Sequence, residues 1–223
     1  MTPNAEQVLA PAPGGELPEL ANVRWRKRVD EGSLRRADRL WTLSAVAHQV
    51  PFVVVALVLP ILNPIMIPVA LVALAFAWII PALYASRGVG ALRQPARAGD
   101  AAENRALGLL GDLVGHDARE LLTATGMVLE RGELGVWLVA GAGALLVRPG
   151  GRRVQCYCVR ATGEDLPLSD RIAHLLLALR ADERGFATVA NLTFSGACWR
   201  VRRRLDPPGR QALRAATRAG KRG

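Results

Sequence analysis

Three cysteines and one histidine are the residues of this sequence whose types could together bind a metal ion. Cys156 and Cys158 are two residues apart in a predicted strand, so both thiols project from one face, about 7 Å apart along the backbone. Cys198 on a later predicted strand and His174 on a predicted helix would complete four zinc ligands if the fold brought them together. The alternative is that the cysteines are buried as small apolar groups, because C-x-C is not a usual zinc spacing. The sequence leaves a metal or thiol site open and assigns no cofactor.

A second set of residues could do acid–base or hydrolytic chemistry. His116 and the aspartate that follows it could bind a metal ion or transfer protons, and Glu130 and Glu133 precede a predicted strand that contains Gln155. This arrangement resembles the acidic and Gln/Glu-x-Lys pattern of metal-dependent nucleases, but Tyr157 stands where the lysine would be. We therefore assign no catalytic residue and expect a protein that is not an enzyme. The alternative is a membrane-anchored, metal-dependent enzyme related to a degenerate nuclease.

Three polar side chains lie inside a long uncharged run, residues 40–86. They are Ser44, His48 and Gln49, and the first two are four residues apart, on one face of a helix. An ionisable residue inside a membrane is a candidate for ion or proton transfer, which keeps a small transporter or channel subunit open as an alternative function. Hydrogen bonds to a neighbouring helix would explain these residues equally well.

Arginines dominate the end of the chain, where residues 200–223 contain nine basic residues and one acidic residue. A predicted strand, Ala197–Leu205, alternates apolar residues with arginines, and a basic helix is predicted from Pro208 onward. The cations expected to form an anion-binding surface are Arg200, Arg202, Arg204, Arg210 and Arg214. The first expected partner is a bilayer with anionic headgroups; nucleic acid is less favoured, because Trp199 alone offers a stacking platform.

The uncharged run must form the elements that place these residues. It is more than twice the roughly 20 residues that cross a bilayer once, and Asn63-Pro64 near its midpoint predicts a turn. The sequence therefore predicts a transmembrane hairpin of two helices, Leu40–Leu62 and Ile65–Ala85. Basic residues flank both outer ends and none lies at the turn, so both termini are expected in the cytoplasm, with the protein in the inner (plasma) membrane.

The remainder of the chain reads as a folded α+β domain. An amphipathic helix, Ala101–Ala124, precedes four short apolar runs separated by turns: Met127–Glu130, Leu134–Ala140, Ala144–Arg148 and Arg152–Arg160. A helix from Ser169 to Arg184 and two further strands, Phe186–Phe194 and Ala197–Leu205, follow. Strands linked by hairpins predict a mainly antiparallel sheet with helices on one face.

Composition limits the remaining possibilities. The chain has 223 residues, of which 51% are hydrophobic and three are cysteines, which argues against both a disordered chain and a disulfide-stapled one. We expect four segments: a disordered leader and basic juxtamembrane helix (1–39), the hairpin (40–86), a linker (87–100), and the cytoplasmic domain with its basic tail (101–223). The predicted function is a hairpin-anchored cytoplasmic binding or regulatory module, whose partner would be a protein or a second copy of the chain.

Overall fold

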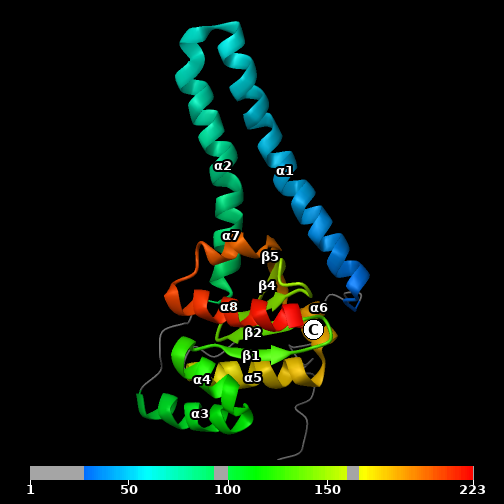
Figure 1. Cartoon of the computed structure of the whole chain (residues 1–223), viewed down its shortest axis with the longest axis vertical. Helices are drawn as coiled ribbons and strands as arrows, with labels where there is room; N and C mark the ends of the chain where they lie inside the picture. Colours follow the sequence, from blue (N-terminus) through cyan, green and yellow to red (C-terminus); the bar gives the residue numbers. More distant parts are fainter. Residues whose placement is uncertain (1–27, 93–99, 160–165, 223) are drawn as a thin grey trace, which may run out of the picture.

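The computed structural model describes residues 28–92, 100–159 and 166–222. A long helical hairpin stands on a globular body (Figure 1). The hairpin consists of α1 (Glu31–Leu62), the short 3-10 helix η2 (Pro64–Met66) and α2 (Ile67–Gly90). The helices of the body are α3 (Asp100–Leu113), α4 (His116–Thr125), α5 (Leu168–Ala181), α6 (Glu183–Val189), α7 (Cys198–Arg202) and α8 (Pro207–Arg222). Its strands are β1 (Val128–Arg131), β2 (Val136–Ala140), β3 (Gly143–Val147), β4 (Arg153–Cys158) and β5 (Asn191–Ala197). The predicted leader, 1–23, and part of the predicted linker lie outside the described residues.

The hairpin turns where the sequence predicts. Asn63 ends α1 in an extended conformation, its side chain accepts a hydrogen bond from the Ile65 amide at 3.0 Å, and Pro64 opens η2. Both helices are longer than predicted. Helix α1 begins at Glu31, because Asp30 and Ser33 form a capping box, and α2 continues to Gly90, into the segment predicted as a linker.

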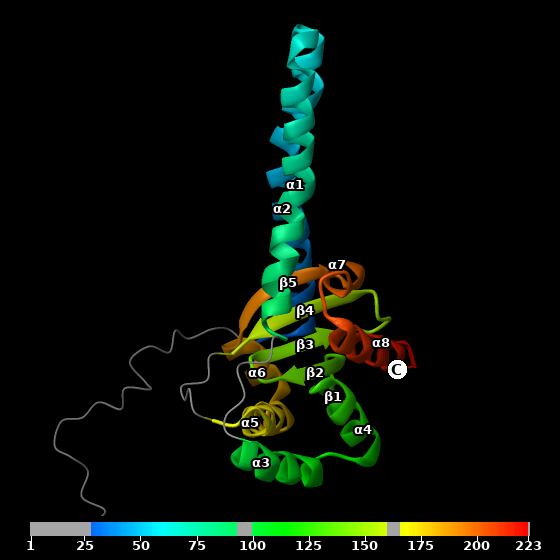
Figure 2. The same cartoon turned by 90° about the vertical axis from the view of Figure 1, so that its left-hand side faces the viewer.

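The body contains one antiparallel sheet of five strands in the order β1-β2-β3-β4-β5, which confirms the predicted α+β class. Strand β5 lies next to the hairpin and β1 lies farthest from it (Figure 2). The turn between β2 and β3 requires glycine at position 143. Its φ is +155°, and a Cβ there would lie 2.1 Å from the Tyr157 carbonyl oxygen of β4.

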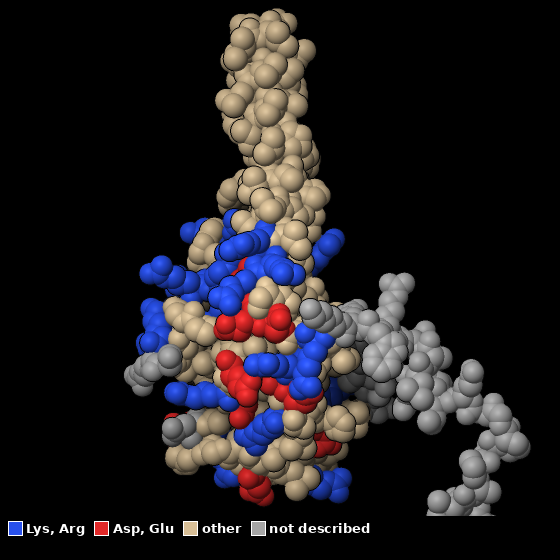
Figure 3. All heavy atoms as spheres, turned by 90° about the vertical axis from the view of Figure 1, so that its right-hand side faces the viewer, with Lys and Arg blue, Asp and Glu red and all other residues tan. Residues whose placement is uncertain are grey.

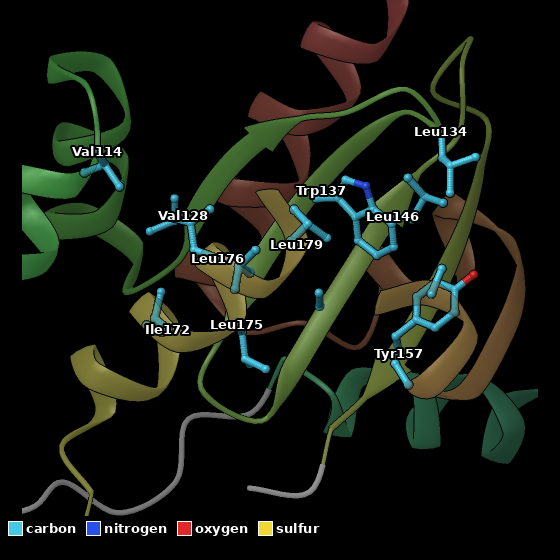
Figure 4. Close-up of a cluster of buried hydrophobic side chains, with 14 of the residues drawn as sticks. Val114, Val128, Leu134, Trp137, Leu146, Tyr157, Ile172, Leu175, Leu176 and Leu179 are labelled. Atoms are coloured by element: carbon cyan, nitrogen blue, oxygen red, sulfur yellow. The ribbon is translucent and has the colours of Figure 1, made fainter. Parts of the chain in front are cut away.

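Helices cover both faces of the sheet, so the prediction that they lie on one face is wrong. Strands β2 and β3 are buried at every position, and alternate residues enter two separate cores. Trp137, Leu146 and Tyr157 belong to the core that the sheet forms with α3, α4, α5 and α6 (Figure 4). Leu138 and Leu145 point the other way, toward α2, α7 and α8. Burial on both faces explains why residues 134–147, which supply these two strands, include no charged residue.

The two legs of the hairpin enclose the edge strand β5. Leu34 of α1 joins the core on the α5 side, whereas Ala85 and Leu92 at the end of α2 join the core on the α8 side. Where the legs meet β5, Trp41 packs edge-on against Phe194, with ring centroids 6.2 Å apart. The hairpin therefore completes both cores at this edge of the sheet.

Two segments predicted as strands are helical in part. Residues 186–189 belong to α6. Asp182 is the N-cap of this helix, and its side chain accepts a hydrogen bond from the Gly185 amide; the strand begins only at Asn191. The segment 198–202 is α7, not a strand. Val201 and Leu205, four residues apart, are both buried in the α8-side core, so this helical spacing prevailed over the period-two alternation of arginines.

Candidate functional site

The four residues considered as metal ligands do not converge. Cys156 is fully buried on β4, Cys158 is partly buried on the same face, and Cys198 begins α7 beside that core. His174 is exposed on α5, which covers the opposite face of the sheet. Burial raises the pKa of the Cys156 and Cys198 thiols, and Arg202 partly opposes the shift at Cys198. Within the described residues, no group of three or more His, Cys, Asp or Glu side chains is arranged to hold a metal ion.

The acidic residues considered for hydrolysis are engaged in ion pairs at the far edge of the sheet. Glu130 on β1 pairs with Arg180 of α5 at 2.8 Å, and Glu133 pairs with Arg184 at 3.2 Å. Gln155 lies on β4, with β2 and β3 between it and β1, so the structure does not bring it to Glu130. His116 is exposed and lies 3.7 Å from Glu120 of its own helix.

The polar residues of the uncharged run lie on α1, at the level of Tyr84 on α2. His48 Nδ1 is 2.6 Å from the carbonyl oxygen of Ser44, and the His48 ring meets Tyr84 of α2 with centroids 6.1 Å apart. Ser44 and Tyr84 also line an apolar groove of about 430 Å³ beside Trp41. The structure thus brings Ser44 and His48 together with aromatic residues, and Gln49 is half-buried nearby in sequence.

A polar cluster that the sequence did not predict joins α1 to the sheet, and its members Asp38, Gln155 and Ser195 are buried. Asp38 of α1 is only 8% exposed, accepts a hydrogen bond from the Ser195 hydroxyl of β5, and pairs with Arg153 of β4, whose Nε lies 3.0 Å from Asp38 Oδ2. The Arg153 guanidinium also donates to Thr42 Oγ1 at 3.2 Å. We call Asp38, Thr42, Arg153, Gln155, Tyr157 and Ser195 the junction cluster.

The remaining members of the junction cluster extend it beneath α1. Gln155 Nε2 donates to the Leu34 carbonyl oxygen at 3.3 Å, and the Tyr157 hydroxyl donates to Gln155 Oε1 at 3.3 Å. Burial raises the pKa of Tyr157, so this hydroxyl keeps its proton and remains a donor. The signal that could have identified the cluster is the spacing of Leu34, Asp38 and Ala45, which places a carboxylate on the buried face of α1.

The predicted basic residues lie on α7, α8 and the segment between them. Trp199 is 48% exposed and lies between two guanidinium groups, with Arg200 at 5.4 Å and Arg203 at 4.9 Å from its ring centroid. Lysine and arginine side chains gather where the hairpin enters the body, and the hairpin above shows none (Figure 3). The exposed guanidinium groups of α7 and α8 are suited to binding anions.

Comparison with known proteins gives no relative: no family model, no curated protein and no solved structure matches this chain.

Proposed function

We propose that this protein is an integral protein of the plasma membrane whose hairpin, α1 and α2, crosses the bilayer twice and anchors a cytoplasmic binding or regulatory module. The observation that carries the proposal is the surface of the hairpin. Both helices are long and apolar enough to span a membrane, and large side chains such as Ile61 and Ile65 are 82% exposed. Contact with lipid would remove this apolar surface from water, at about 25 cal/mol for each Å².

The contacts inside the hairpin support the same proposal. Where α1 and α2 approach each other, the buried residues are alanines: Ala56, Ala70 and Ala73 form one cluster, and Ala77 is buried one turn farther on. Small residues allow close approach of helices in lipid, where large apolar side chains gain nothing from mutual burial. Between the helices lie these alanines and one stacked pair, Phe52 and Phe76, while most other large side chains are exposed. Such a surface suits a bilayer rather than water.

Charge supports the orientation with both termini in the cytoplasm. Described arginines before the uncharged run include Arg35, Arg36 and Arg39, and Arg87 follows it. The turn around Asn63 contains no basic residue. Because basic residues favour the cytoplasmic side, the body and both chain ends would lie there.

The attachment of the hairpin supports a regulatory role for the module. Helix α1 contacts one face of the β4–β5 edge through the junction cluster, and α2 contacts the other face through Gly88, which packs against Phe194. A change in the angle between the helices within the bilayer would therefore alter the contacts on both sides of β5. Because such coupling is reciprocal, a ligand that binds the body and changes these contacts would also change the angle between the helices.

Membrane integration can be tested with a matched pair of substitutions in the full chain. Leu74 of α2 and Leu177 of α5 are 46% and 49% exposed, so neither substitution disturbs a packed core. Leu74→Lys places a charge in the bilayer, at a cost of about 2.5–3.5 kcal/mol, whereas Leu177→Lys does not. We expect wild-type protein and Leu177→Lys to resist alkaline carbonate extraction, and Leu74→Lys to be extracted or degraded. Extraction of the wild-type protein would overturn the proposal.

A further inference from the structure

The described basic residues of α7 and α8 lack acidic partners, whereas several other arginines of the body have them. Among the described residues from 198 to 221, no arginine or lysine forms an ion pair. Asp206 is the one acidic residue in this part of the sequence, and its side chain accepts a hydrogen bond from the Gly209 amide. Five arginines outside it pair with carboxylates across elements: Arg28, Arg148, Arg153, Arg180 and Arg184. The cations of α7 and α8 therefore remain available to an external anion.

Four cations from three elements surround one groove of about 420 Å³. Arg152 precedes β4, Arg202 ends α7, and Arg214 and Lys221 lie on α8. The groove floor includes Leu213, which is fully buried in the α8-side core. The volume falls within the range of small-molecule sites, and no carboxylate lines it.

Backbone hydrogen bonds fix the walls of this groove to one another. The Cys198 amide donates to the Arg152 carbonyl oxygen at 2.9 Å, which joins the start of α7 to the β3–β4 turn. The Gly150 amide donates to the Gly220 carbonyl oxygen at 3.0 Å, which joins the same turn to the end of α8. The four side chains thus extend from a rigid frame, so binding an anion would order only the side chains themselves.

The groove lies close to the expected bilayer surface. Helix α7 contacts α2, and Val201 and Leu205 share a core with Ala85, which follows the aromatic end of the apolar span at Tyr84. Trp199, which lines the groove, is half exposed between two arginines on α7, the helix that contacts α2. A half-exposed indole is typical of residues at the headgroup level.

From these observations we propose that the groove between α7 and α8 binds the phosphate group of an anionic phospholipid. Arg202 and Arg214 would each donate two N–H groups to phosphate oxygens, and Arg152 and Lys221 would add positive charge. This inference rests on the proposed function, because it takes the lipid from the bilayer that the hairpin crosses. It gives the module a ligand class and a specific site for it.

The test compares two double variants of the full chain that lose the same charge. The groove variant is Arg202→Gln with Arg214→Gln; the control is Arg105→Gln with Arg218→Gln, whose arginines are exposed but do not line the groove. Each protein is purified in neutral detergent with a mixture of phosphatidylglycerol and phosphatidylcholine, and retained lipid is counted by native mass spectrometry. We expect the wild type and the control to retain phosphatidylglycerol selectively, and the groove variant to lose this retention at least about tenfold.

Three outcomes would overturn the lipid assignment. The first is a groove variant that retains as much phosphatidylglycerol as the control. The second is displacement of the lipid by excess inorganic phosphate, which would indicate a site for free phosphate. The third is a short DNA duplex that binds more tightly than the lipid and is lost in the groove variant. Carbonate extraction distinguishes these outcomes from failure of the proposed function. If the wild-type protein resists extraction and the groove variant still retains its lipid, only the lipid site is overturned.

Discussion

Single residues determine how closely the hairpin can approach the sheet, and Gly88 is the tightest point. A Cβ at Gly88 would lie 2.5 Å from the Phe194 Cβ and 3.2 Å from the Cys156 Sγ, whereas a Cβ at Gly90 of the same helix would meet nothing within 4 Å. We expect Gly88→Ala to lower the free energy of unfolding by about 1–3 kcal/mol, because α2 or Phe194 must move. Gly90→Ala should leave it unchanged or raise it by up to about 1 kcal/mol. Thermal unfolding of both variants in detergent checks this. A Gly88→Ala variant as stable as the wild type would contradict the contact between α2 and Phe194.

The cysteines are also distinguished at the residue scale. Because burial raises the pKa of the Cys156 thiol, its thiolate is scarcer at neutral pH than that of an ordinary cysteine, and maleimide cannot reach it in the folded protein. We expect Cys156 to be modified only after unfolding, and to stay less reactive than the half-buried Cys158 as the pH rises through the ordinary thiol range. Peptide mass spectrometry after labelling with and without denaturant measures both. Modification of folded Cys156 at the rate of Cys158 would contradict its burial.

At the scale of elements, the junction cluster attaches α1 to β4 and β5. Asp38→Asn preserves the shape of the side chain but leaves the Arg153 guanidinium without its carboxylate, so we expect a loss of about 1–3 kcal/mol in the free energy of unfolding. Combining it with Arg153→Gln should cost less than the sum of the two single changes, by about 1 kcal/mol. Chemical denaturation of the four proteins gives this coupling energy. Arg39→Gln, at an exposed position on α1, is the control, with an expected change within about 0.5 kcal/mol.

Elements were predictable where local sequence and burial agree. The turn at Asn63-Pro64 and the strands β1–β4 follow from proline, glycine and apolar runs that act within a few residues. The segment 197–205 was predicted wrongly, because its arginines alternate as in a strand while its buried pair, Val201 and Leu205, has helical spacing. Only contact with α2 and α8 shows which spacing determines the structure, and that contact is not local.

At the scale of the whole molecule, less of the candidate site was predictable than of the fold. The basic residues of 200–214 were identified from charge alone. That Arg202 and Arg214 line one groove depends on α7 being a helix beside Arg152, which lies far away in sequence. Asp38 lies in the segment predicted as a juxtamembrane helix, and its role was not predictable because its partners on β4 and β5 come from distant parts of the chain. Likewise, whether His174 could join Cys156 and Cys198 in one metal site depended on which face of the sheet α5 would cover.

The most direct test of the central claim, that the hairpin crosses the membrane with the body in the cytoplasm, is the accessibility of single cysteines in intact bacterial cells. In a variant with the three native cysteines replaced, Asn63→Cys reports the exposed turn of the hairpin and Gln211→Cys an exposed position on α8. We expect a membrane-impermeant maleimide to label position 63 in intact cells and position 211 only after permeabilisation. Labelling of position 211 in intact cells, or protection of both positions until permeabilisation, would contradict the claim.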